Sequence, residues 1–91
     1  MREQRWAEML GRCLQHLGKN EGDIRNDRKS APWKAAVALR LKETSQAGNR
    51  WLSERLGMGR PEAVTVYVRR LQACGVGANR DYVRLTTIVS A

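Results

Sequence analysis

The chain has 91 residues, a length that fits a single domain of short elements and leaves no room for a large buried core. It carries 17 lysine and arginine residues against nine aspartate and glutamate residues, and the resulting net charge of +8 favours an anionic partner such as nucleic acid. Charged residues interrupt every apolar stretch, so we expect neither a transmembrane span nor a signal peptide, and we expect a cytoplasmic protein.

The N-terminal third predicts one helix and a connector. Apolar residues recur at intervals of three and four through residues 3–17, the pattern of an amphipathic helix. Residues 18–30 are polar and charged, and they predict a connector in which Asn20 caps one turn and Ile24 packs back onto the core.

A second helix is predicted directly after the connector. Ser30 is a suitable N-cap, and Pro32 is tolerated in a first helical turn, where its missing donor would be unpaired anyway. The residues expected to face inward are Trp33, Ala36, Val37, Ala38 and Leu41. The basic residues expected to stay in solvent are Lys34, Arg40 and Lys42.

Residues 51–71, within a core and motif region at residues 31–72, contain the most informative pattern, two short amphipathic helices separated by a glycine break. Ser45 is a candidate cap for the first of them, and Gly57-Met58-Gly59 forms the break. Met58 is expected to fill the space under the turn, and Val64 to anchor the second helix onto the first. This arrangement predicts a helix-turn-helix.

A last helix is predicted over residues 79–89, after a turn at residues 75–77. Asn79 and Asp81 suit a helix start, and the helix would bury Tyr82, Leu85, Ile88 and Val89. The β-branched run at 86–89 weakly favours a strand, but no other segment offers a strand to pair with it. The sequence therefore predicts one all-α domain, a small bundle of about four helices containing a helix-turn-helix.

The expected outward face of the second motif helix predicts duplex DNA binding. The residues predicted to contact base edges are Arg60, Glu62, Thr65 and Val66. The residues predicted to contact phosphates are Arg50, Arg69 and Arg70. Residues 40–72 hold seven basic and three acidic side chains, so positive charge concentrates in the segment that would meet the groove.

Several segments also follow the pattern of a known family. They are Trp33-Lys34-Ala35-Ala36, Glu43-Thr44-Ser45, the run from Trp51 to Gly59, and Val64-Thr65, with weaker flanks at Leu17-Gly18 and at residues 81–85. The pattern resembles the C-terminal DNA-binding region of REP-associated tyrosine transposases and their relatives. The resemblance implies a bacterial or archaeal, nucleoid-associated protein, derived from a transposase that acts on repetitive palindromic or hairpin DNA.

Catalysis is not expected to accompany this binding. The nuclease domain of that family uses a pair of histidines to hold a metal ion, whereas this chain has only His16. Tyr67 and Tyr82 fit apolar stripes, so we expect core tyrosines. Cys13 and Cys74 lack zinc-site spacing, so we expect reduced, buried thiols, with one disulfide between them as the alternative. The expectation is a non-enzymatic protein without metal or cofactor.

Two other functions compete with this interpretation. A glycine between two amphipathic helices also forms a simple αα-hairpin, and the protein would then be a helical interaction module whose basic surface only keeps it soluble. Trp6, Trp33 and Trp51 would suit single-stranded nucleic acid if they were exposed, although all three fall on stripes that are expected to be buried.

Overall fold

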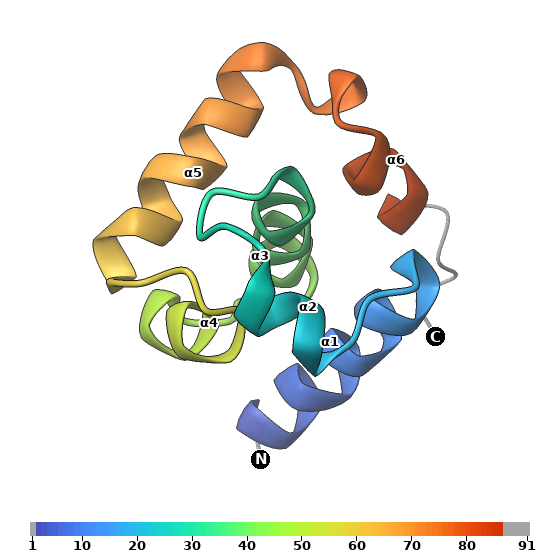
Figure 1. Ribbon diagram of the computed structural model, residues 1–91, viewed down its shortest axis with the longest axis vertical. Coiled ribbons are helices and arrows are strands. Elements are labelled where there is room, and N and C mark those ends of the chain that lie inside the picture. Colours follow the sequence, from blue (N-terminus) through green and yellow to red (C-terminus); the bar gives the residue numbers. More distant parts are fainter. Residues whose placement is uncertain (1, 87–91) are drawn as a thin grey trace.

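The computed structural model describes residues 2–86, which form six α-helices and one 3₁₀ turn and contain no β-strand (Figure 1). The elements are α1 (Arg2–Leu17), α2 (Glu21–Asn26), α3 (Pro32–Ser45), α4 (Asn49–Arg55), α5 (Pro61–Cys74), η1 (Val76–Ala78) and α6 (Arg80–Thr86). The predicted all-helical class is confirmed. The helices outnumber the four expected, in part because α2 forms within the predicted connector. Ile88 and Val89 of the predicted last helix lie outside the described residues.

Helix α3 is the centre of the molecule, and α1, α5 and α6 all pack against it (Figure 1). Its small and aliphatic residues allow neighbours to approach from every side, as expected for a helix that is buried all round. The inward residues predicted from the sequence are all buried, and Ala35 and Leu39 are buried as well.

Lys34 corrects the prediction that the basic residues of this helix stay in solvent. Arg40 and Lys42 are partly exposed, but Lys34 is 0% exposed. Its Nζ donates hydrogen bonds to the carbonyl oxygens of Ile24 at 2.7 Å, Asp27 at 3.1 Å and Gly57 at 3.5 Å. Burial lowers the pKa of Lys34, and the nearby charge of Asp27 partly opposes that shift. A buried ammonium group therefore ties the connector to the glycine turn.

Two predicted helix caps are wrong. The N-cap of α3 is Ala31, one residue after the predicted Ser30, and Pro32 takes the first helical position. Ser45 ends α3 and does not cap α4, whose N-cap is Gly48. Neither observed N-cap makes a side-chain hydrogen bond, and Pro32 at the first helical position favours the start of α3.

The two predicted asparagine caps are confirmed. Asn20 Oδ1 accepts from the backbone N–H of Asp23 at 3.1 Å, and the Asp23 carboxylate accepts from the Asn20 N–H at 2.9 Å. Ile24 in this short helix packs against the core, as predicted. Asn79 Oδ1 accepts from the N–H of Tyr82 at 2.8 Å and so caps α6.

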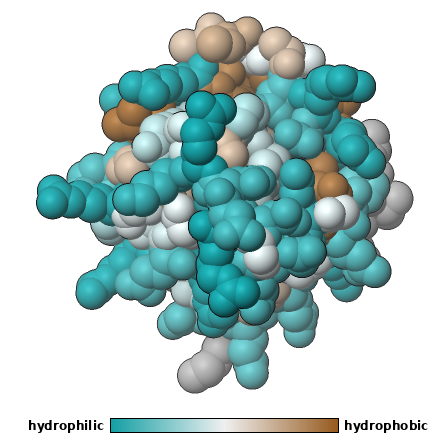
Figure 2. Space-filling model, in the orientation of Figure 1, coloured by the Kyte–Doolittle hydropathy of each residue, from teal (hydrophilic) through white to brown (hydrophobic). Residues whose placement is uncertain are grey.

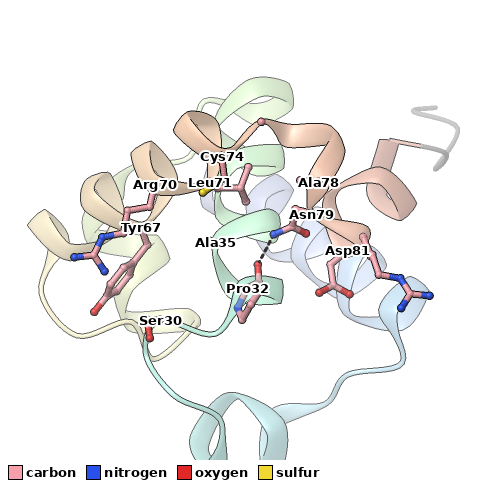
Figure 3. Close-up of a pocket in the computed structure, with 12 residues that line it drawn as sticks. Ser30, Pro32, Ala35, Tyr67, Arg70, Leu71, Cys74, Ala78, Asn79 and Asp81 are labelled. Atoms are coloured by element: carbon pink, nitrogen blue, oxygen red, sulfur yellow. Dashed lines mark hydrogen bonds between the residues drawn. The ribbon is translucent and has the colours of Figure 1, made fainter.

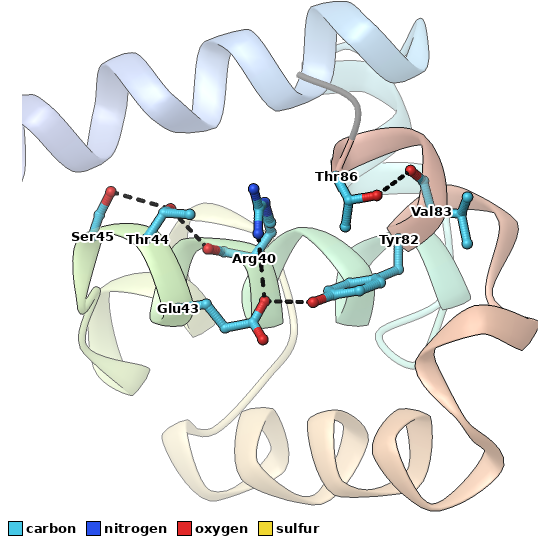
Figure 4. Close-up of polar contacts among 7 residues, drawn as sticks. All are labelled: Arg40, Glu43, Thr44, Ser45, Tyr82, Val83 and Thr86. Carbon is cyan, nitrogen blue, oxygen red and sulfur yellow. Dashed lines mark hydrogen bonds and ion pairs between the residues drawn. The ribbon is translucent and has the colours of Figure 1, made fainter. Parts of the chain in front are cut away.

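Helix α6 is fastened to α3 by a polar cluster at the edge of the core (Figure 4). The Tyr82 hydroxyl donates to Glu43 Oε1 at 2.6 Å, and Arg40 Nη1 lies 3.9 Å from the same oxygen. Burial, and then the hydrogen bond from Tyr82 to Glu43, raise the pKa of Tyr82. Tyr82 and Leu85 are buried, as predicted for this helix.

The two cysteines have different environments. Cys13 is 1% exposed and Cys74 is exposed, and both are free thiols. The prediction of two buried thiols is therefore wrong for Cys74, which ends α5 just before the turn at Gly75. None of the helices within residues 2–86 combines the length and apolar character needed to cross a membrane.

Candidate nucleic-acid interface

The predicted helix-turn-helix is formed by α4, residues 56–60 and α5. Met58 is 0% exposed beneath the turn, and Leu52, Leu56 and Val64 are buried equally completely between the helices. Gly57 has a φ of +61°. A Cβ added at Gly57 would lie 3.1 Å from the Ile24 carbonyl oxygen, so both backbone conformation and close approach favour glycine here.

A polar contact fixes α5 relative to α4. Asn49 Nδ2 donates to Thr65 Oγ1 at 2.8 Å, and Lys42 Nζ donates to Asn49 Oδ1. Asn49 therefore joins α3, α4 and α5. The sequence pattern does not reveal this role of Asn49, because no local spacing indicates a partner 16 positions away.

Thr65 is not on the outward face predicted for it. It is partly buried, and its hydroxyl accepts the hydrogen bond from Asn49. On a helix with 3.6 residues per turn, position 65 falls on the flank of α5 that is turned toward α4. Its predicted contact with a base edge remains a prediction, and its hydroxyl already has a partner.

The other predicted base-contacting residues lie in solvent at the start and middle of α5. Arg60 is the N-cap residue, Glu62 lies in the first turn, and Val66 is 44% exposed. Glu62, Val66 and Arg69 are spaced by four and three residues, which places them on one helix face opposite the buried Val64, Val68 and Leu71. Neither Arg60 nor Arg69 forms an ion pair with a described residue.

The remaining predicted phosphate-contacting residues, Arg50 and Arg70, have contacts within the chain. Arg50 lies 3.7 Å from Glu54, and both side chains are well exposed, so this pair contributes little stability and leaves Arg50 available. The Arg70 guanidinium lies 5.9 Å from the centre of the Tyr67 ring, a cation–π contact. Tyr67 is only partly buried, although the sequence predicts it in the core.

Arg70 also borders an open groove of about 440 Å³ between α3, α5, η1 and α6 (Figure 3). Tyr67 and Arg70 lie on one side of it, and Asn79 and Asp81 lie on the other. Asn79 Nδ2 donates to the Pro32 carbonyl oxygen at 3.2 Å across the groove. The sequence did not reveal this groove, since its lining comes from four separate elements.

The tryptophans do not present a stacking surface for single strands. Trp33 and Trp51 are buried, and the Trp33 indole N–H donates to the Asp27 carboxylate at 2.7 Å. Trp6 is partly buried; its indole N–H donates to the Ser45 carbonyl at 2.8 Å, and its ring meets that of Trp51 edge-on at 5.5 Å. The prediction that these rings serve packing is confirmed for Trp33 and Trp51 and holds in part for Trp6.

The face of the molecule seen in Figure 2 is mostly polar. In the space-filling view hydrophilic side chains dominate, and hydrophobic atoms form small separate patches (Figure 2).

The described residues contain no group of three histidine, cysteine, aspartate or glutamate side chains able to hold a metal ion. Comparisons with protein-family models, with curated proteins and with solved structures found no match to this chain.

Proposed function

We propose that this protein binds double-stranded DNA sequence-selectively, with the exposed face of α5 in the major groove. The observation that carries the proposal is the division of α5 into two faces. Val64, Val68 and Leu71 are buried against the fold, whereas Arg60 and Arg69 project into solvent without an ion-pair partner among the described residues. A rigidly held helix with unpaired arginines matches the way a recognition helix meets DNA.

The chemistry of each exposed side chain suggests its contact. Arginine at position 60 matches the two acceptors of guanine, a carboxylate at 62 accepts from the cytosine amine, and Val66 suits the thymine methyl group. Arg50, Arg69 and Arg70 are proposed to contact phosphates, because exposed arginines suit the negatively charged DNA backbone. We propose no catalytic activity and no cofactor for this role.

The resemblance to transposase DNA-binding regions suggests the kind of target. Repetitive palindromic DNA folds into hairpins, so we propose a preference for a hairpin duplex over a random duplex of the same length. The groove in Figure 3 favours a second candidate, a helical module that docks a partner protein.

Salt dependence separates the two candidates. We expect the anisotropy of a labelled duplex to report binding whose log affinity falls with log salt concentration, at a slope of about −2.7 for three phosphate contacts. The measurement compares a random duplex with a palindromic hairpin over a range of salt concentrations. Absence of binding to both at low salt would refute the proposal and leave the protein-docking module.

A further inference from the structure

A second basic side chain lies beside the start of α5, contributed by the connector. Lys29 and Arg60 line the same cleft, together with Met58, Gly59, Glu62, Ala63 and Tyr67. The Lys29 side chain crosses Gly59: a Cβ at that glycine would lie 3.3 Å from Lys29 Cδ and 3.8 Å from its Nζ. The absence of a side chain at position 59 therefore gives Lys29 its path toward the first turn of α5.

The connector is held in this position by buried contacts. Lys34 Nζ bonds the carbonyl oxygens of Ile24 and Asp27 on one side and that of Gly57 on the other. The Asp27 carboxylate also accepts from the Trp33 indole. Because the segment just before Lys29 is hydrogen-bonded to the turn just before Arg60, the two cations line the same cleft.

The side chains of Lys29 and Arg60 are exposed, and neither forms an ion pair with a described residue. Two unpaired cations that line one cleft repel each other, and an anion bound in the cleft reduces that repulsion. Glu62 is the one acidic residue of the cleft, and it does not pair with either cation.

We propose that Lys29 binds a DNA backbone phosphate next to the base pair that Arg60 contacts. The DNA interface thereby extends from α5 onto the connector, outside the helix-turn-helix. This inference rests on the proposed function, and it adds a fourth phosphate contact to Arg50, Arg69 and Arg70. A lysine is suited to this task, since it contacts phosphate as a point charge and carries no base preference.

The test compares Lys29→Ala with Arg12→Ala on labelled duplexes of two sequences over a range of salt concentrations. Arg12 is an exposed cation of α1, which packs against α3 and α6 away from α5 (Figure 1), so its loss removes the same charge from a distant surface. We expect Lys29→Ala to weaken binding to both sequences alike and to make the salt slope shallower by about 0.9. Thermal melting checks that both variants remain folded.

The outcomes of this test distinguish failure of the Lys29 contact from failure of the proposed DNA binding. If the unaltered protein binds duplex DNA and Lys29→Ala binds with the same affinity and slope, Lys29 is not a contact and the connector lies outside the interface. Lys29 is also not a contact if Lys29→Ala and Arg12→Ala weaken binding equally, because net charge alone would then explain the loss. If the unaltered protein binds no duplex, the proposed function itself has failed.

Discussion

Lys34 is a buried basic residue whose hydrogen bonds join the connector to the glycine turn. A fully buried ammonium group is costly unless hydrogen bonds replace its hydration, and here three carbonyl oxygens do so. The sequence predicts this lysine in solvent because charged residues are rarely buried. Its partners lie 10, 7 and 23 positions away, so no local pattern reveals them.

Titration of the Cys13 thiol makes the free energy of unfolding depend on pH in the alkaline range. Burial raises the pKa of its thiol from 9.0 to about 11, an effect that the charge of Arg40 partly opposes. The stabilisation is complete below pH 9, and it is lost as the pH rises toward 11, because the unfolded chain then releases a proton that the folded chain retains.

We therefore expect the free energy of unfolding to fall by about 2 kcal/mol between pH 9 and pH 11 on account of Cys13. Tyr82, whose pKa is also raised, adds to the loss, and Lys34, whose pKa is lowered, opposes it. Urea titrations of the unaltered protein and Cys13→Ala across this range isolate the thiol. Cys13→Ala should be less stable than the unaltered protein at pH 7, but its free energy of unfolding should fall less between pH 7 and pH 11. Equal falls in the two proteins would show that the Cys13 thiol does not cause the pH dependence.

At the scale of elements, Gly57 in the turn and Gly11 in α1 differ in whether the position requires glycine. Gly57 has a positive φ, and a Cβ added there would lie 3.1 Å from the Ile24 carbonyl oxygen, whereas a Cβ at Gly11, within α1, would meet no atom within 4 Å. Only the first of these positions needs glycine.

Gly57→Ala should destabilise the protein by about 1 to 2 kcal/mol, through backbone strain and the close carbonyl contact. Gly11→Ala should stabilise it by about 0.5 to 1 kcal/mol, since alanine restricts the unfolded chain and suits a helix interior. Chemical denaturation of the two variants measures both effects. Gly57→Ala that is as stable as the unaltered protein, or more stable, would show that the turn does not constrain position 57.

The elements also show which helix boundaries a sequence can reveal. Asn20 and Asn79 cap the helices predicted for them because their side chains satisfy backbone N–H groups within three residues. Ser30 and Ser45 have equally suitable side chains but do not cap α3 and α4. Pro32 favours the observed start of α3, and the side chains of Ser30 and Ser45 carry no information about where the neighbouring helices pack.

At the scale of the whole molecule, the apolar periodicity predicted the helical class and most of the core. The period of three and four residues places Val64, Val68 and Leu71 on one face, and the structure buries all three. The orientation of Thr65, the exposure of Cys74, and the groove beside Arg70 depend on how helices pack side by side. Periodicity within one helix carries no information about that packing.

The central claim, that the outer face of α5 reads base pairs, is tested most directly by selecting bound sequences from a random duplex library. The unaltered protein should enrich a site that contains guanine at one position. Arg60→Ala should lose that preference, worth about 1 to 3 kcal/mol, whereas Arg69→Ala should bind more weakly and enrich the same site. Enrichment of the same site with the same strength by Arg60→Ala would contradict the claim.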